Sequence, residues 1–230
     1  MALTAGKEAG GDIRPFLRWA GSKRKLLKHL IPFIPKNYGR YFEPFLGGGA
    51  LFFFLQPQAA EVSDASEPLI RTYRAVKKHH EDILGILTPL RPNRETFELF
   101  KRQSAGDMID DAARFIFLNK ACWNGLYRVN SKGIFNVPYG APKTDFVIDE
   151  GNFIRCSKQL RRRSIRIRRQ DFSEIENRVN SGDFVFLDPP YVTGHNMNGF
   201  VDWNESLFSW RDQIRLAGMA ARLAARGANV

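Results

Sequence analysis

The strongest constraint on the fold is a short apolar segment that ends abruptly in two prolines. Residues 184–187 read Phe-Val-Phe-Leu, and Asp188, Pro189, Pro190 and Tyr191 follow directly. An unbroken apolar run of this length is typical of a strand buried in a parallel sheet. Proline cannot continue such a strand and holds the residue before it extended. The sequence therefore predicts a carboxylate, two rigid carbonyls and an aromatic ring at the carboxyl end of a buried strand, where α/β sheets bind ligands.

The groups after this strand suit one kind of chemistry. The exocyclic amine of a nucleobase is a poor nucleophile because its lone pair is delocalised into the ring. Asp188 and the carbonyl of Pro189 offer acceptors for its two N–H groups, which would make the nitrogen more tetrahedral, and Tyr191 offers a ring for base stacking. The alternative is a turn that merely ends an ordinary strand, since motifs of four residues recur by chance.

A second candidate segment is the glycine-rich stretch 45–49, Phe-Leu-Gly-Gly-Gly. Glycine lets the backbone approach a ligand closely and enter a helix at once. No Gly-Lys-Ser/Thr follows, and the G-x-G-x-x-G pattern of dinucleotide-binding loops is absent. The stretch favours a compact cofactor without a phosphate chain, and a flexible loop is the alternative.

Two further segments carry candidate ligand-binding residues. Asp64 ends a second predicted strand, and an acid at this place commonly accepts ribose hydroxyls, although an isolated Asp is more often a helix N-cap. Trp19, Gly21 and Lys23 stand where a loop enters a basic helix. The alternative for this segment is an ordinary surface helix.

In this order, the segments resemble the DNA adenine-N6 methyltransferases of the Dam type, from about residue 16 to about residue 208. In that family a W-x-G-x-K element, an F-x-G-x-G loop and the following acid bind S-adenosylmethionine, and D-P-P-Y is the catalytic motif. The resemblance implies a cofactor site of Trp19, Gly21, Lys23, Phe45, Gly47, Gly49 and Asp64. It implies a catalytic motif of Asp188, Pro189, Pro190 and Tyr191. Asp171 and Phe172, after the alternating strand 164–168, are expected to contact the cofactor adenine, with a strand-to-helix cap as the alternative.

The resemblance also implies a target-recognition segment within residues 117–140. This stretch is rich in Asn, Gly and aromatic residues, and a turn at 131–133 predicts a β-hairpin. Its side chains can read base edges, since Arg pairs with guanine and Asn with adenine. The expected DNA-binding residues are Trp123, Asn124, Arg128, Asn130, Asn136 and Pro138. Arg128 and Pro138 match family positions used by readers of GATC, whereas 194–200 departs from the Dam archetype.

The expected fold is α/β, with a Rossmann-like methyltransferase sheet and an inserted recognition subdomain of helices and a β-hairpin. Residues 14–68 and 160–230 would form the S-adenosylmethionine-binding catalytic domain, and 69–159 the recognition subdomain. Apolar spacing predicts helices near 69–90, 96–101, 110–118 and 210–225. Residues 227–230 read as the start of another strand. Because family members continue with further strands, the chain is expected to be truncated at its C-terminus.

Composition points to a polyanionic partner. The formal net charge is +11, from 35 Lys and Arg against 24 Asp and Glu. A basic run extends from Arg155 to Arg169, for which we expect phosphate contacts; a solvated face is the alternative. Two cysteines, Cys122 and Cys156, give no disulfide framework or metal spacing, and no apolar stretch is long enough to span a membrane.

Together these features predict site-specific transfer of a methyl group from S-adenosylmethionine to a flipped adenine in double-stranded DNA, without a metal. The protein is expected in the cytoplasm, bacterial or phage-encoded, with a cognate restriction endonuclease as a possible partner. Three alternatives stay open. N4-cytosine methylation is disfavoured because such relatives usually carry Ser before Pro-Pro-Tyr. An inactive or truncated DNA-binding fragment is suggested by the early C-terminus, and RNA is disfavoured by the duplex-reading hairpin. Neither the recognition sequence nor the oligomeric state follows from the sequence.

Overall fold

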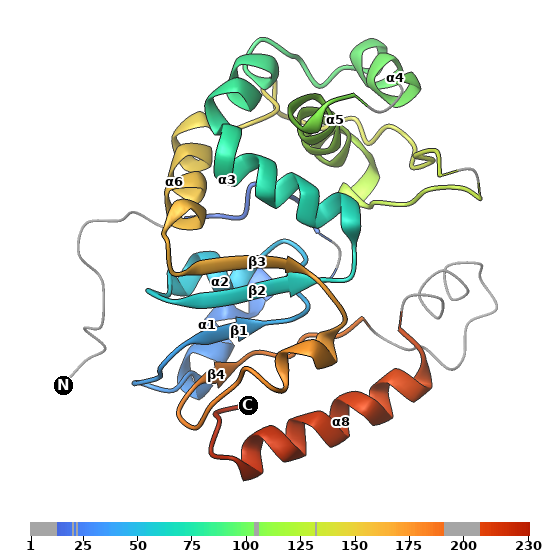
Figure 1. The fold of residues 1–230 in the computed structure, drawn as a ribbon. Coiled ribbons are helices and arrows are strands. Elements are labelled where there is room, and N and C mark those ends of the chain that lie inside the picture. The colour runs from blue at the N-terminus through green and yellow to red at the C-terminus, as the bar shows by residue number, and fades with distance from the viewer. Residues whose placement is uncertain (1–12, 20, 22, 104–105, 132, 191–207) are drawn as a thin grey trace.

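A parallel sheet forms the centre of the protein (Figure 1). The computed structural model describes residues 13–19, 21, 23–103, 106–131, 133–190 and 208–230, so Tyr191 lies outside the described residues. The strands are β1 (Tyr41–Glu43), β2 (Ala60–Asp64), β3 (Ile165–Arg169) and β4 (Phe184–Val185). They lie in the order β3-β2-β1-β4, and every neighbouring pair is parallel. Because the chain order reverses beside β1, a switch point of the kind that binds ligands lies between β1 and β4.

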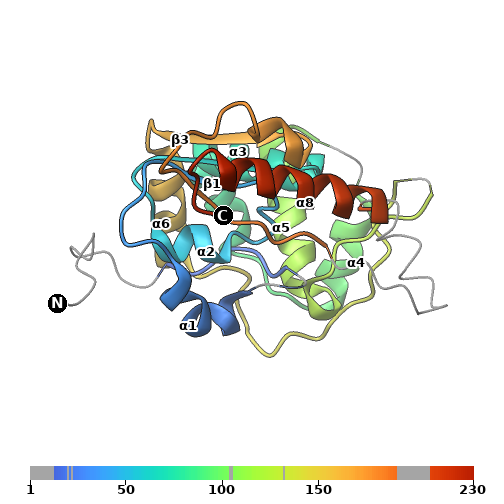
Figure 2. The ribbon, with the colours of Figure 1, turned by 90° about the horizontal axis from the view of Figure 1, so that it is seen from below.

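Successive side chains of the central strands enter separate hydrophobic cores, because they face opposite sides of the sheet. Tyr41 and Phe184 belong to the larger core, and Phe42 and Val185 to the smaller one. The larger core is closed by the helices α2 (Ala50–Leu55), α3 (Glu67–Leu87), α5 (Met108–Ala121) and α6 (Glu150–Arg161). The smaller core is closed by the 3₁₀ turn Phe172–Ile175 and by α8 (Trp210–Ala225). In Figure 2, α1 (Leu27–Leu30) and α2 lie together on one side of the strands.

The long connection from β2 to β3 consists of helices that begin at capping residues. Asn93, Asp107 and Asp149 each accept a hydrogen bond from a first-turn amide, at the start of α4 (Arg94–Arg102), α5 and α6. Before β1, the chain forms the 3₁₀ turns Lys23–Leu26 and Ile31–Phe33 on either side of α1. Figure 1 shows α3, α5 and α6 above the strands and α8 below them.

The predicted helices are confirmed with small shifts at their ends, and α8 has the predicted bounds. The strand at 184–187 is shorter than predicted, although the Phe186 amide still donates to the Phe42 carbonyl at 2.9 Å. Helix α6 was not predicted, because its basic residues were interpreted as a charge run. Its apolar side Phe153, Cys156 and Leu160 has helical spacing and is buried.

The expected hairpin is present in an irregular form. Antiparallel bridges join Val129 to Phe135 and Cys122 to Tyr139, and a 3₁₀ turn covers Trp123–Gly125. Close packing at the base of the hairpin explains one glycine. A Cβ at Gly140 would lie 2.3 Å from the carbonyl oxygen of Cys122, which no side chain can tolerate.

The sheet continues beyond β4 at the last residues of the chain. Asn229 forms a parallel bridge with Phe184, and the Val185 amide donates to the Asn229 carbonyl at 2.8 Å. The expected strand start at 227–230 is therefore confirmed. Within the described part of the chain, no helix combines the length and the apolar character needed to cross a membrane.

A buried polar network around Glu61 joins β2 to β3 and to Arg178. Glu61 of β2 is only 7% exposed, and its Oε1 accepts from Arg178 Nη2 at 2.6 Å and from Gln170 Nε2 at 3.2 Å. Arg168 donates to the other carboxylate oxygen at 3.1 Å. Burial alone would raise the pKa of Glu61, but these partners outweigh it and hold the pKa below its usual range. Folding therefore favours the charged carboxylate.

We predict that Arg178→Met destabilises the protein by about 1.5–3 kcal/mol, because hydrogen bonds to a buried charge are lost. Urea unfolding at neutral pH measures the change. Arg222→Met, which breaks the exposed pair with Glu176, is the control and should leave the unfolding midpoint nearly unchanged. The stabilisation by Glu61 is present at neutral pH and is lost as the pH falls through its lowered pKa, so the two variants should converge in acid. Equal losses in both variants at neutral pH would contradict this role.

Candidate active site

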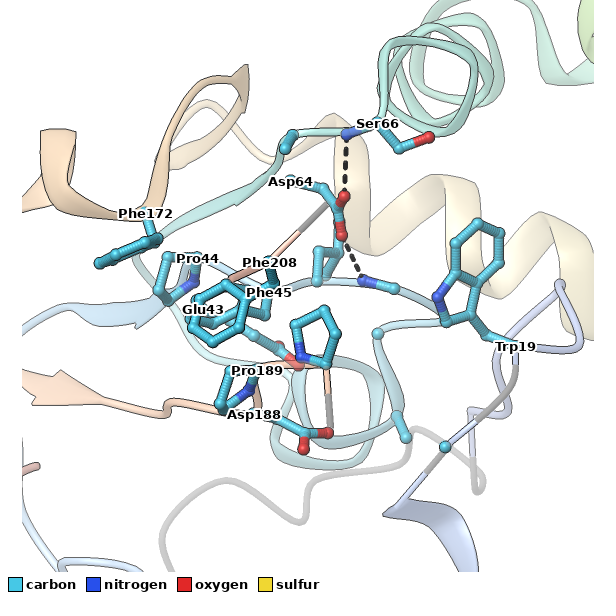
Figure 3. A pocket seen from close by; sticks show the side chains of 18 of the residues that line it. Trp19, Glu43, Pro44, Phe45, Asp64, Ser66, Phe172, Asp188, Pro189 and Phe208 are labelled. Atoms are coloured by element: carbon cyan, nitrogen blue, oxygen red, sulfur yellow. Dashed lines mark hydrogen bonds between the residues drawn. The ribbon is translucent and has the colours of Figure 1, made fainter. Parts of the chain in front are cut away.

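A cavity of about 600 Å³ opens at the carboxyl ends of the strands, at the switch point (Figure 3). The ends of all four strands contribute lining residues: Glu43, Asp64, Gln170 and Phe186. The glycine loop, Trp19, Lys23 and the segment 188–190 complete much of the wall. Parallel pairing therefore brings together segments that the sequence analysis identified separately. The volume is in the range of cavities that hold small-molecule ligands.

The glycine loop packs closely against Trp19 and Tyr73. Gly47 and Gly49 have φ of 48° and 68°, a conformation that other residues rarely adopt. A Cβ at Gly47 would lie 2.7 Å from Cδ1 of Trp19, whose ring stacks on Phe115. The Tyr73 hydroxyl, on α3, donates a hydrogen bond to the Gly47 carbonyl at 3.1 Å and so ties the loop to this helix. The loop is thus closely packed against Trp19 and Tyr73.

Asp64 ties the glycine loop to the end of β2. Its Oδ2 accepts from the Gly47 amide at 3.0 Å and its Oδ1 accepts from the Ser66 amide at 2.9 Å, as drawn in Figure 3. Ser66, not Asp64, is the N-cap residue of α3. Burial raises the pKa of Asp64 and the hydrogen bonds from Gly47 and Ser66 only partly oppose this. The carboxyl group faces the cavity with acceptor capacity to spare.

Aromatic rings form one wall of the cavity. Phe172 stacks on Phe45 with ring centroids 5.4 Å apart, and Phe208 contacts both rings. The Arg215 guanidinium lies over the Phe172 ring, 4.8 Å from its centroid. The wall can hold a flat ring by stacking. Phe208 was not among the predicted site residues, because it lies just before α8 and far along the chain from the other two.

Asp171 caps the 3₁₀ turn Phe172–Ile175, which the sequence analysis considered as an alternative to a contact with the cofactor adenine. Its Oδ1 accepts from the Ser173 amide at 3.0 Å, and Glu174 completes a capping box. Arg215 pairs with the same oxygen at 2.7 Å. Burial would raise the pKa of Asp171, but the bonds from Ser173 and Arg215 outweigh it and lower the pKa. Asp171 nevertheless lines the cavity beside Phe172.

Lys23 lies against the carboxylate of Asp188. The distance from Lys23 Nζ to Asp188 Oδ1 is 2.5 Å, and Nζ also donates to the Gly21 carbonyl at 3.0 Å. Both side chains are mostly buried, and Pro189 and Pro190 line the cavity next to them. Two residues expected to serve different ligands, Lys23 for the cofactor and Asp188 for the base, therefore form one ion pair.

Glu43 is a site residue that sequence reasoning missed. It ends β1, is 3% exposed, and accepts a hydrogen bond from the Tyr41 hydroxyl at 2.9 Å. Burial, followed by the nearby charge of Asp188, raises the pKa of Glu43 to about 8 despite that bond. The carboxyl group is therefore protonated at neutral pH. The available signal was a glutamate inside an apolar strand directly before Pro44.

The hairpin contributes to the rim of the cavity through Leu126, Tyr127 and Val129. Among the predicted DNA-binding residues, four are exposed: Trp123, Asn124, Asn130 and Pro138. The other two contact each other, since Arg128 Nε donates to Asn136 Oδ1 at 2.9 Å. The Asn130 side chain accepts from the Ile134 amide at 3.0 Å and shapes the turn.

The basic run 155–169 lies mainly away from this site. Residues 161–163 connect the end of α6 to the start of β3, so they lie at the amino ends of the strands, whereas the cavity is at the carboxyl ends (Figure 1). Further along the run, Arg168 pairs with Glu61 and Arg169 with Glu67. The phosphate contacts expected of residues 161–163 would therefore lie away from the cavity, and they stay a prediction.

Comparison with known proteins gives the family. Residues 19–230 match the model of the D12 class N6 adenine-specific DNA methyltransferases, so the chain belongs to this family. A relative from Lactococcus lactis subsp. cremoris, named type II methyltransferase M1.LlaDCHI, is 38% identical over 94% of this chain and 79% of its own length. Type II methyltransferase M.MjaIII of Methanocaldococcus jannaschii is 36% identical over 95% of this chain and 83% of its own length. A DNA adenine methylase of Serratia marcescens is 29% identical over 91% of this chain and 78% of its own length.

These findings confirm the expected fold class and the expected enzyme class. The chain is an N6-adenine DNA methyltransferase by family, with a parallel α/β sheet consistent with the Rossmann-like methyltransferase fold. The family is specific for N6 of adenine, which argues against the alternative of N4-cytosine methylation.

We predict that Glu43→Gln removes part of the pH dependence of stability. In the unfolded chain a Glu titrates at about 4.3, whereas the folded pKa is about 8. The folded state therefore binds the extra proton between these values, so stability falls as the pH rises through this window. The Gln variant cannot ionise and should lose less stability between pH 5 and pH 9. Thermal unfolding without cofactor across this range measures it, with the exposed Glu81→Gln as control. A wild-type pH profile in Glu43→Gln would contradict the buried, neutral carboxyl.

Proposed function

We propose that the cavity binds S-adenosylmethionine and presents its methyl group to N6 of an adenine flipped out of duplex DNA. The supporting observation is that the glycine loop, Asp64 and the turn of Asp188 and Pro189 converge on one cavity of about 600 Å³. These segments are 17 to 141 residues apart in the sequence, from Gly47 to Asp64 and to Asp188, and they meet at one edge of the sheet. A purely structural turn would not need this convergence.

The described residues fit this cofactor. Phe45, Phe172 and Phe208 offer a stacking face for a purine ring. Asp64 uses two backbone amides, and a carboxylate with about four lone-pair sites can still accept from ribose hydroxyls. We assign Trp19, Gly21, Lys23, Phe45, Gly47, Gly49, Asp64, Asp171 and Phe172 to the cofactor site, and Glu43 to its floor. When bound, S-adenosylmethionine supplies a methyl group that its sulfonium has already activated.

The residues of the chain orient the amine. Lys23 holds Oδ1 of Asp188, and we assign the other carboxylate oxygen to one N–H of the adenine amine. The Pro189 carbonyl, restrained by Pro190, accepts the second N–H. Both acceptors draw charge onto N6 and aim its lone pair into the cavity, so catalysis rests on positioning and electrostatics. Tyr191, outside the described residues, completes the catalytic motif by stacking on the base.

Residues 69–159 are proposed as the part that recognises the target, joined to the catalytic part of 14–68 and 160–230. In this part, the proposed DNA contacts are Trp123, Asn124, Arg128, Asn130, Asn136 and Pro138. The substrate is double-stranded DNA, and the site of action is the cytoplasm. Two of the relatives described above are named type II methyltransferases, which favours a cognate restriction endonuclease as partner.

We predict that Asp188→Asn lowers kcat for methyl transfer by at least about 100-fold, because one of two oriented acceptors for the amine is lost. Transfer of a radiolabelled methyl group to duplex DNA measures it. Calorimetry with S-adenosylmethionine and a gel shift with DNA should show binding close to that of the wild type. Turnover near the wild-type rate would remove Asp188 from the mechanism. A wild-type chain that binds DNA without transfer would instead support the inactive DNA-binding fragment.

We predict that Arg128→Ala relaxes the sequence preference at one base pair, with a loss of roughly 1–3 kcal/mol of discrimination. Sequencing of DNA methylated by the variant measures the preference. Asn136→Ala removes the same hydrogen bond but keeps the guanidinium. Because Asn136 is itself a proposed DNA contact, this variant should change the preference at a base pair other than the one that Arg128 reads. If both variants weaken all sequences equally and change no preference, Arg128 is a brace of the hairpin rather than a reader of bases.

A further inference from the structure

A second cavity, of about 210 Å³, lies beside the first, and four basic residues contribute to its lining. Arg14, Arg18, Arg24 and Lys120 line it, and Asp149 is the one acid among the described lining residues. The Oδ1 of Asp149 is already used, because it accepts from the Asn152 amide at the start of α6. Cations therefore outnumber acids by four to one among the described lining residues.

Lys120 lies at the centre of this charge excess. In the described part of the chain, the side chains of Arg18, Arg24 and Lys120 form no hydrogen bond or ion pair. Burial, followed by the charge of Arg18, lowers the pKa of Lys120 to about 8; Arg24 acts in the same direction, and Cys156 and Asp149 oppose it. An ammonium group held among like charges without a partner is costly unless an anion completes the site.

The two cavities share a wall made of consecutive residues. Arg18 and Arg24 line the second cavity, and their chain neighbours Trp19 and Lys23 line the first. Buried Asn119, next to Lys120, fixes the wall by donating to the carbonyls of Arg18 at 2.6 Å and Gly125 at 2.9 Å.

Packing across this wall leaves no space for larger residues. A Cβ at Gly125 would lie only 2.3 Å from Cβ of Arg18. Arg18, which lines the second cavity, therefore packs directly against Gly125, which lines the first.

We propose that the cavity of Arg14, Arg18, Arg24 and Lys120 binds a backbone phosphate of the DNA strand whose adenine enters the first cavity. The inference rests on the proposed function, because it requires that DNA reaches the first cavity. The volume is below the range of about 300–1,000 Å³ that small-molecule ligands occupy, which suits one phosphate group rather than a nucleotide. Phosphate matches Arg donors bidentately, and a DNA strand presents a charge about every 3.4 Å along its axis.

The proposed site has a pH signature. Binding of an anion requires the charged form of Lys120, whose pKa is about 8 in the free protein. The affinity for DNA should therefore fall as the pH rises through about 8, because a neutral lysine must first take up a proton. Lys120→Met should bind DNA more weakly than the wild type at pH 7 and should show less of this fall.

The decisive experiment compares two double variants that change charge equally. Arg24→Gln with Lys120→Met removes two cations from the cavity, and Lys158→Met with Arg161→Gln removes two exposed cations of α6. Fluorescence anisotropy with a duplex that the wild-type chain methylates gives the affinity between 50 and 200 mM salt. We expect the log–log salt slope of the cavity variant to flatten by about 0.9, because one phosphate is no longer neutralised, and the α6 variant to keep the wild-type slope. Unchanged calorimetric binding of S-adenosylmethionine shows that both variants are folded.

Two results would overturn the proposal. Equal flattening in both double variants would mean that DNA senses only the net charge. A wild-type slope in the cavity variant would exclude a DNA phosphate from the cavity. Thermal stabilisation by inorganic phosphate that disappears in this variant alone would then identify a site for free phosphate. A wild-type chain that neither binds nor methylates duplex DNA would overturn the proposed function itself, which separates the two failures.

Discussion

The parallel pairing of β1 with both β2 and β4 is the constraint on which the site depends. β1 has only three residues, and all of them are buried. It is hydrogen-bonded to a parallel strand on each side, and both of its faces are packed, so its position in the sheet is well defined. Because parallel strands end at the same edge, Glu43, Asp64 and Asp188 are brought to one cavity from three distant segments. The alternation of Tyr41 and Phe42 between two cores prevents a shift of register by one residue, which would exchange the two faces of the strand.

Several acidic side chains line the same cavity, where their negative charges would repel each other. Each of them is stabilised in a different way. Burial keeps Glu43 protonated at neutral pH, and backbone amides of Gly47 and Ser66 bind the carboxylate of Asp64. Lys23 pairs with Asp188 and is the only basic residue among the described residues that line the cavity. A cavity with more acids than bases favours a ligand that carries positive charge. This balance is consistent with a sulfonium cofactor and would disfavour a phosphate-bearing one.

The sequence predicted what depends on local pattern. Helix α8 has its predicted bounds, and the glycine loop and Asp64 lie together as expected. Glu43 was missed because its role follows from burial, which the sequence does not give directly. Helix α6 was missed because its many basic residues hid a buried side of Phe153 and Leu160. The contacts of Asp171 with Arg215 and of Lys23 with Asp188 join residues far apart in the chain, and only the three-dimensional arrangement reveals them.

Net charge alone did not indicate which cations share a cavity next to the proposed active site, and the fold supplies the reason. The dense run near Arg162 is conspicuous in the sequence, yet it lies at the amino ends of the strands and partly binds the protein itself, since Arg162 donates to Gln159 at 3.2 Å. Arg18, Arg24 and Lys120 are scattered over a hundred residues but share a cavity. Consecutive residues of the chain separate these cations from the acids that line the first cavity. This arrangement underlies the two proposals, a cationic cofactor in the first cavity and a DNA phosphate in the second.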